Sequence, residues 1–452
     1  MKTPLKLFFL GSVLVSLLFF SGCTLPFLPK PNNNNEAITL KYWGLWEPGT
    51  NFQALIDEYK VAHPNITVVY EERSPKFYYE TLKSRLIGGN GPDIFRMHMS
   101  WTPRLAQLGM SPLPASIMDS NTYKSTFYPA AYDWCTVSGK QYCMPLMYDG
   151  LALVYNAGLF EAAGIDRAPR TWEEFRTDAK KLTITNNGTI TQAGAAMGDE
   201  FVMNYSDIIG LLMLQNGASF QDTKGEVTFH NTISQDGRNT GAEALDFYTM
   251  FVKGGDKVWD KSLGDSVKAF AAGKVGMMFA NSWQLQNVIN TNPSLKVAVA
   301  GVPQLPTADG GTTNINWASF WVEGVSAKSA HPAEAWDFLK FITQREQQLN
   351  FQRTITASSS ARTYGEIYSR ADLASALSGD QYLKSYVEAA PTAKSWYFCD
   401  RTWDEKFDDT INEALKGAVK TAAGGGDSVS ALSGAATTVQ GVLTAKEPAL
   451  TQ

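Results

Sequence analysis

Tryptophans stand directly after several of the predicted strands, with charged side chains close to them in the sequence. An indole offers a flat apolar face, whereas carboxylate, amide and guanidinium groups offer planar hydrogen-bonding edges. Loops that follow strands collect in clefts, so these residue types together favour a site for a flat-faced, hydroxyl-rich and uncharged solute. The candidates are Trp46, Glu47, Trp101, Asp149, Trp283, Trp317, Trp396, Tyr397, Asp400 and Arg401, with Asn281 as a further polar candidate.

Burial in a core is the competing interpretation for each tryptophan. Trp172 and Trp336 fall at helical core spacing, which makes core packing the better prediction for both. Trp43 shares an alternating strand pattern with its neighbours, so a core position and a cleft position are equally compatible with it. Glu47 and Asp400 are equally compatible with solvated or salt-bridged surface carboxylates.

Motifs for catalysis and metal binding are missing from the sequence. The four histidines are far apart and form no His-Glu-x-x-His or Cys/His metal pattern. Gly273-Lys274 is followed by Val275 and lacks the earlier glycine of a phosphate loop, and Gly-x-Ser-x-Gly does not occur. The acidic residues between 404 and 409 have the spacing of a solvated helix face rather than of a glycosidase pair. We therefore expect no catalytic residue, metal or cofactor.

The amino-terminal residues have the composition of a secretory signal. The apolar run Leu7–Phe20 has 14 residues, too few for the roughly 20 that a membrane-spanning helix needs. Ser21-Gly22-Cys23 follows and resembles the bacterial lipoprotein cleavage box, although Phe20 departs from the usual aliphatic residue. We expect residues 1–22 to be a cleaved signal peptide and Cys23 to carry a lipid. An ordinary signal peptide with an unmodified cysteine is the alternative. Residues 23–36, rich in proline and asparagine, are expected to form an extended tether.

The composition describes an ordinary soluble chain of more than one core. Removal of 22 residues from 452 leaves 430, which calls for at least two lobes. The net charge of −5 provides no broad basic field, so we do not expect nucleic acid as a partner.

Cys135 and Cys143 flank Ser138-Gly139, which signals a hairpin turn. A two-residue turn would set Cys135 opposite Tyr142, whereas a three-residue loop or a bulge would set it opposite Cys143 and favour a disulfide. Two separate buried thiols are the alternative. If the bridge forms, Cys399 is unpaired.

Strand and helix patterns alternate along the chain, which favours an α/β fold. We expect strands at 38–43, 66–70, 93–95, 151–155, 275–280, 295–300 and 321–326, and helices at 50–63, 77–86, 171–182, 267–272, from Pro332, and at 429–443. No linker separates two halves, which indicates that the chain crosses between its lobes more than once.

The order and spacing of several short segments resemble the family 1 extracellular solute-binding proteins, the maltose-binding-protein-like receptors of ABC importers. The segments are 43–46, Gly91-Pro92-Asp93-Ile94, 139–145 with 153–156, Thr171-Trp172-Glu173-Glu174-Phe175, 270–277, Ser282-Trp283, Gly301-Val302-Pro303 and 334–339.

The resemblance implies the two-lobed type II fold of periplasmic binding proteins, with three crossings and a ligand cleft between the lobes. The crossings are expected near 147–150, 302–306 and 353–358. The N-terminal lobe is expected at 37–147 plus 304–355, and the C-terminal lobe at 148–303 plus 356–452.

The family pattern also assigns expected roles. Trp283 and Trp396 match aromatic stackers, and Asp149 matches an acidic position that accepts hydroxyl hydrogens. Ser100, near Trp101, stands where the best-known member has an acidic residue, so specificity for that member's sugar is not implied.

The resulting hypothesis is a monomeric lipoprotein at the bacterial cell membrane that captures a mono- or oligosaccharide and delivers it to an ABC permease. A receptor for a polyol, glycerophosphate or amino compound is the alternative, with Arg96 or Arg401 facing an anion and Glu47 or Asp149 facing a cation. A secreted carbohydrate-active enzyme is a third interpretation.

Overall fold

The computed structural model describes residues 36–307, 310–358 and 364–445. The predicted signal peptide at 1–22, the predicted lipid site Cys23 and the tether up to residue 35 lie outside the described residues. Within the described ranges, no helix combines the length and apolarity that crossing a membrane requires.

One sheet has the strand order β2-β1-β3-β14-β6, in which β1 is parallel to β2 and β3 and β14 is antiparallel to β3 and β6. In β1, Ile38, Leu40 and Tyr42 are buried while Thr39 and Lys41 are exposed, the alternation of a strand with one face on a core. Its strands are β1 (Ile38–Gly44), β2 (Ile66–Glu72), β3 (Ile94–His98), β6 (Cys143–Met144) and β14 (Trp321–Val325).

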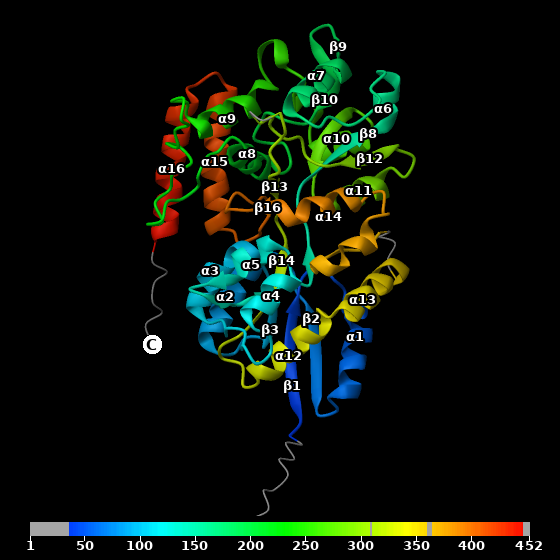
Figure 1. Cartoon of the computed structure of the whole chain (residues 1–452), viewed down its shortest axis with the longest axis vertical. Coiled ribbons are helices and arrows are strands. Elements are labelled where there is room, and N and C mark those ends of the chain that lie inside the picture. The colour runs from blue at the N-terminus through cyan, green and yellow to red at the C-terminus, as the bar shows by residue number, and fades with distance from the viewer. Residues whose placement is uncertain (1–35, 308–309, 359–363, 446–452) are drawn as a thin grey trace, which may run out of the picture. The chain divides into compact units, whose positions relative to one another are not determined.

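Helices from distant parts of the sequence cover this sheet. Contacts join α1 to β2 and α13, and α12 to β14, and Figure 1 shows blue α1 beside yellow α13. The helices around this sheet are α1 (Gly49–Ala62), α2 (Tyr78–Gly88), η1 (Met99–Trp101), α3 (Thr102–Leu108), α4 (Ser120–Thr126), α5 (Pro129–Cys135), α12 (Pro332–Ile342) and α13 (Arg345–Ser358).

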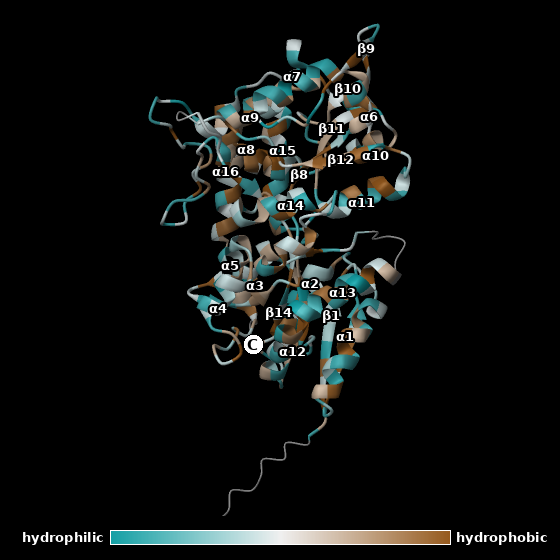
Figure 2. Ribbon diagram, turned by 45° about the vertical axis from the view of Figure 1, so that its right-hand side comes forward, coloured by the Kyte–Doolittle hydropathy of each residue, from teal (hydrophilic) through white to brown (hydrophobic). Residues whose placement is uncertain are grey.

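A second sheet has the order β12-β8-β11-β10-β9, in which β8 is antiparallel to both neighbours and β10 is parallel to β11. Its strands are β8 (Ala152–Asn156), β9 (Ile184–Asn186), β10 (Thr189–Ala195), β11 (Val275–Ala280) and β12 (Val297–Ala300). Buried α8 is largely brown in Figure 2, whereas charged α7 is largely teal.

The remaining helices follow the second sheet in sequence or pack around it, and α15 contacts both α16 and α9. They are α6 (Ala157–Ala162), α7 (Trp172–Leu182), α8 (Tyr205–Gln215), α9 (Thr240–Met250), η2 (Gly254–Asp256), η3 (Lys261–Leu263), α10 (Ser266–Ala271), α11 (Ser282–Thr291), η4 (Ala371–Leu377), α14 (Lys384–Ala389), η5 (Ala390–Thr392), α15 (Phe407–Ala423) and α16 (Ser428–Thr444).

Among the described residues, three short strand pairs lie outside the two five-stranded sheets; the first is a local hairpin, and the other two join segments far apart in the sequence. They are β4 (Thr136–Val137) with β5 (Lys140–Gln141), β7 (Met147–Tyr148) with β15 (Ile367–Tyr368), and β13 (Asn316–Trp317) with β16 (Ala393–Lys394).

The predicted α/β class with two lobes, each built on a sheet, is confirmed. Strands of the first sheet come from 37–147 and 304–355, and those of the second from 148–303. The exact limits of the lobes remain a prediction.

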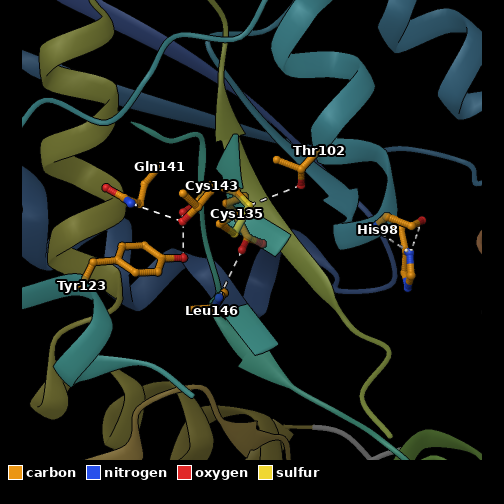
Figure 3. The surroundings of a disulfide bond; sticks show 10 residues. His98, Thr102, Tyr123, Cys135, Gln141, Cys143 and Leu146 are labelled. Carbon is orange, nitrogen blue, oxygen red and sulfur yellow. Dashed lines mark hydrogen bonds between the residues drawn. A yellow bond between two sulfur atoms is a disulfide. The ribbon is translucent and has the colours of Figure 1, made fainter. Parts of the chain in front are cut away.

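Cys135 ends α5 and Cys143 begins β6, and a disulfide joins them (Figure 3). The hairpin between them pairs Val137 with Lys140, so its turn has two residues. The expectation that a two-residue turn disfavours the bridge is wrong. The chain leaves the hairpin after β5 and enters the first sheet as β6, which brings the two Cα atoms to 5.1 Å, within the range that a disulfide spans.

The surroundings of the bridge are buried and hydrogen bonded. The Tyr123 hydroxyl donates to the Cys143 carbonyl at 3.0 Å, and Thr102 Oγ1 lies 3.5 Å from the sulfur of Cys143 (Figure 3). Among the described residues, Cys399 is the free cysteine, and it is buried.

We expect the disulfide to stabilise the fold measurably. For cysteines separated by eight positions, the chain-entropy model gives about 2 to 3 kcal/mol. Dithiothreitol should therefore lower the Tm of the wild type and of the control variant Cys399→Ala, but not that of the Cys135→Ala/Cys143→Ala double variant, when unfolding is followed by circular dichroism. A wild-type Tm unchanged by the reductant would contradict this assignment.

Candidate functional site

A cavity of about 370 Å³ lies where the ends of both sheets meet. The carboxyl ends of β1, β3 and β11 lead into residues of its lining, which is where α/β folds place ligands. The lining consists of Trp46, Arg96, His98, Met147, Asp149, Asn204, Asn281, Ser282, Trp283, Gln286, Asn287, Ser319, Phe320, Trp321, Tyr364, Gly365, Glu366, Asp400, Arg401 and Trp403.

Three of the lining indoles form one continuous aromatic wall. The ring centroid of Trp46 lies 5.7 Å from that of Trp321 and 5.8 Å from that of Trp403. Trp46 follows β1 with a φ of 70°, a conformation that ends the strand. Aromatic pairs at such distances hold each other in place, so the wall presents apolar faces at fixed positions.

Trp283 reaches the cavity from another element, the first turn of α11. The helix begins with a capping box, in which Asn281 and Gln284 satisfy each other's backbone N–H groups. Asn204 Nδ2 donates to Gln284 Oε1 at 2.6 Å, and this hydrogen bond helps to hold the Gln284 side chain in the capping box. Trp283 is 42% exposed, so its indole is available to a solute.

Asp149 lies in the connection between β7 and β8 and accepts hydrogen bonds from the start of α11. Its Oδ1 accepts the N–H of Gly150 at 2.8 Å and that of Ser282 at 3.0 Å, and its Oδ2 accepts the Ser282 hydroxyl at 2.9 Å. Burial raises the pKa of Asp149 to about 6, against the lowering effect of these donors. The carboxylate therefore positions the turn that carries Trp283.

Arg96 lines the cavity, but its guanidinium is already paired with the carboxylate of Glu323 in the neighbouring strand β14. Arg96 Nε donates to Glu323 Oε1 at 2.8 Å, and both side chains are 1% exposed. Arg96 Nη1 donates to the Leu45 carbonyl at 3.0 Å, and the Tyr42 hydroxyl donates to Glu323 at 3.1 Å. Burial raises the pKa of Glu323 despite the adjacent guanidinium. The pair is a buried structural unit of β3 and β14.

His98, which is buried, and Asp400, which is half-buried, are further titratable groups of the lining. Burial lowers the pKa of His98 to about 3, so its ring is neutral and acts as a hydrogen-bonding group. Its Nδ1 lies 2.7 Å from Ser100 Oγ and its Nε2 lies 3.2 Å from Ser319 Oγ. Burial raises the pKa of Asp400, whose Oδ2 accepts the N–H of Asn204 at 3.0 Å.

Several predicted site residues do not line the cavity because they pack elsewhere. Trp396 stacks on Phe220 with centroids 4.7 Å apart, and its Nε1 donates to Gln221 at 3.1 Å. Trp317 is fully buried, and its Nε1 donates to Asp207 at 2.9 Å. Both indoles belong to the core around α8, so the expectation that they face a ligand does not fit their positions.

Trp101, Tyr397 and Glu47 are also absent from the lining. Trp101 is fully buried against Tyr79, with centroids 4.9 Å apart. Tyr397 packs on Trp134 at 5.1 Å, and Glu47 is buried with its Oε2 accepting from Asn51 at 2.8 Å. Of the predicted candidates, the structure places Trp46, Asp149, Trp283, Asp400 and Arg401 in the lining, together with Asn281.

Two indoles of the cavity, Trp321 and Trp403, are not among the residues that the sequence predicts for the site. Trp321 is the first residue of β14, so it precedes its strand, whereas the favoured tryptophans follow theirs. Trp403 stands two residues after the candidate Arg401. This proximity in the sequence is the signal that could have placed Trp403 in the site. Among the described residues, no group of three or more His, Cys, Asp or Glu side chains is arranged to hold a metal ion.

Residues 43–349 match the sequence pattern of a family described as bacterial extracellular solute-binding protein. The chain belongs to this family. The family description places the protein outside the cytoplasm.

Individual relatives agree with this assignment. The multiple sugar-binding protein of Streptococcus mutans is 21% identical over 352 residues, which cover 76% of this chain and 79% of that protein. The cyclic alpha-maltosyl-1,6-maltose binding protein of Arthrobacter globiformis has a similar structure, with a TM-score of 0.73 at 20% identity over 90% of this chain and 99% of that one. The sugar-binding protein MalE of Xanthomonas citri gives 0.71 at 17% identity over 90% and 97%. These relatives are binding proteins, and the structural likenesses show the fold.

We expect the two tryptophans with matched family positions to behave differently on substitution. Trp396→Ala should lower the free energy of unfolding by about 3 to 5 kcal/mol because it opens a cavity among packed rings. Trp283→Ala should change it by about 0.5 kcal/mol or less, since this residue is exposed at the cavity rather than enclosed by packed rings. Urea unfolding followed by circular dichroism measures both values. Equal losses in the two variants would show that this distinction between core and cavity is wrong.

Proposed function

We propose that the protein is the substrate-binding lipoprotein of an ABC importer, which captures a mono- or oligosaccharide in the cavity and delivers it to a membrane permease. The lining carries the proposal: indole faces of Trp46, Trp283, Trp321 and Trp403 surround a space that also presents carboxylate and amide groups. A sugar offers C–H faces to such rings and hydroxyls to such polar groups. The sugar-binding relatives support this choice of solute class.

Anchoring through a lipid on Cys23 is part of the proposal and rests on the sequence of the first 23 residues. A tether of polar residues would leave the lobes free to meet a permease beside the same membrane. The protein would act as a monomer, with ATP hydrolysis on the partner.

Lobe closure provides the coupling between capture and delivery. A solute that contacts groups from both sheets binds the closed arrangement better than an open one. The differential affinity between the two states then sets how far the population shifts. The lining combines Trp46 and Trp321 beside the first sheet with Trp283 beside the second, which is the arrangement that such a mechanism needs.

Charge favours a neutral solute over the anionic and cationic alternatives. Arg96 is paired with Glu323, so within the described lining Arg401 is the cation left to meet a phosphate ester. Asp149 and Asp400 already accept backbone N–H groups. Partly satisfied carboxylates can still accept hydroxyl hydrogens, which suits a sugar or polyol.

Binding without bond cleavage is the proposed chemistry. Asp149, with a pKa of about 6, is the lining group most suited to donate a proton. Its oxygens, however, are engaged with Gly150 and Ser282. The proposed role of Asp149 is therefore to hold the site and accept hydroxyls, and the solute should leave unchanged.

A thermal-shift screen tests the proposal directly. The purified protein is mixed with maltotriose, mannobiose, N,N′-diacetylchitobiose, sorbitol and glycerol 3-phosphate, and the solute is recovered afterwards for chromatography. At one hundred times its Kd, a bound sugar should stabilise the protein by about 2.7 kcal/mol. Trp283→Ala should weaken this effect at least tenfold in Kd, while the control Phe201→Ala, an exposed ring outside the cavity lining, should not.

Three results would contradict the proposal. Stabilisation by glycerol 3-phosphate with no response to any sugar would favour the charged-solute alternative. Recovery of shortened sugars would establish an enzyme. An identical response of Trp283→Ala and wild type would show that the sugar binds outside the cavity.

A further inference from the structure

In residues 401–405, residues with a positive φ alternate with fully buried residues. Arg401, Trp403 and Glu405 have φ values of 58°, 61° and 61°, in the left-handed region that residues other than glycine rarely adopt. Between them, Thr402 and Asp404 are fully buried. The buried residues therefore anchor the segment, while Arg401 and Trp403 face the cavity. Such a conformation persists only where surrounding contacts impose it.

Asp404 supplies several of those contacts through the start of α15. Its Oδ2 accepts the N–H of Asp408 at 2.7 Å, and its Oδ1 accepts those of Lys406 at 3.2 Å and Asp409 at 3.3 Å. The first N–H groups of a helix have no partner within the helix, and its amino end favours negative charge. Asp404 therefore fixes the chain between Trp403 and the 17-residue helix α15.

Arg104 of α3 binds the same carboxylate. Its Nη2 lies 2.9 Å from Asp404 Oδ2, and the side chain of Asp404 is fully buried. The guanidinium of Arg104 lies 3.6 Å from the ring centroid of Phe407 and 4.7 Å from that of Tyr79. These aromatic faces fix its position, so the ion pair is preorganised rather than a mobile surface contact.

A second buried carboxyl joins this anchor to the cavity. Asp408 is hydrogen bonded to the Ser100 hydroxyl, and Ser100 Oγ lies 2.7 Å from His98 Nδ1 in the lining. Burial, and then the neighbouring Asp404, raise the pKa of Asp408 to about 8. Asp408 therefore connects the start of α15 to the lining residue His98 through Ser100.

We propose that Asp404 is a positioning residue for solute binding. Held by Arg104 and by the first turn of α15, its carboxylate fixes the strained backbone that presents Arg401 and Trp403 to the cavity. The affinity readout of this inference rests on the proposed function, whereas its structural readout does not.

The first test compares affinities. Asp404→Ala removes the anchor, and Arg104→Met removes the ion pair while keeping an apolar side chain beside Phe407. Asp427→Ala is the matched control, because Asp427 caps the 17-residue helix α16 by accepting the N–H of Ser430 at 2.8 Å, outside the cavity lining. Calorimetric titration with maltotriose, or with another sugar that stabilises the wild type, should show at least tenfold weaker binding for the first two variants and an unchanged Kd for the control.

The second test reads the position of Trp403 without any ligand. In protein labelled with 5-fluorotryptophan, the resonance of Trp403 is the one lost in Trp403→Phe. It should shift in Asp404→Ala and in Arg104→Met but not in Asp427→Ala. A general loss of helix stability would not produce this difference between the anchor variants and the control.

A Trp403 resonance at its wild-type position in both anchor variants overturns the inference, and so does wild-type affinity in both. If no sugar binds the wild type, the proposed function fails, and the fluorine spectrum alone then decides on Asp404.

Discussion

The hydrogen bonds of Asp149 to the start of α11 are the contact on which the cavity depends. They tie the connection between β7 and β8 to the helix that carries Trp283. The pKa of about 6, against an ordinary 3.8, corresponds to a net cost of about 3 kcal/mol for the charged form, after the hydrogen bonds have offset part of the burial penalty. The contacts that it makes hold the indole of Trp283 in the same cavity lining as the aromatic wall of Trp46, Trp321 and Trp403.

The wall and its anchors illustrate how polar contacts in the interior position apolar surfaces. Arg96 and Glu323 join β3 to β14, the strand that Trp321 begins, and Asp404 holds the segment that contains Trp403. None of these charges is free to attract a solute from water. Their role is to hold the rings at fixed positions. Binding of a neutral solute then costs little conformational entropy of the protein's side chains.

Much of the fold could be predicted from the sequence, because strand alternation and capping residues are local signals. The strand at 275–280 and the cap at Thr171 both occur where expected. Trp46 and Trp283, which are expected beside a cleft because each follows a strand closely, both lie in the cavity lining. Helices α8 and α9 are not predicted from the sequence. A helix that is buried on nearly all sides, as α8 is, has no polar face and therefore no amphipathic pattern.

The rest of the site could not be predicted because it depends on what packs on each ring. Trp396 and Trp403 both stand in the same late loop, yet one is covered by Phe220 and the other is 38% exposed. Their difference comes from the positive φ of Trp403 and the buried residues beside it, which no local sequence signal reveals. The disulfide at Cys135 also could not be predicted from local signals, because it depends on the path of the chain after the hairpin turn.

A crystal structure of the protein with a stabilising sugar is the most direct test of the central claim. The account predicts an intact sugar in the cavity, with a C–H face against the indole of Trp283 or Trp403 and a hydroxyl on Asp149. A sugar bound away from these side chains, or an empty cavity in crystals whose protein binds that sugar in solution, would contradict it.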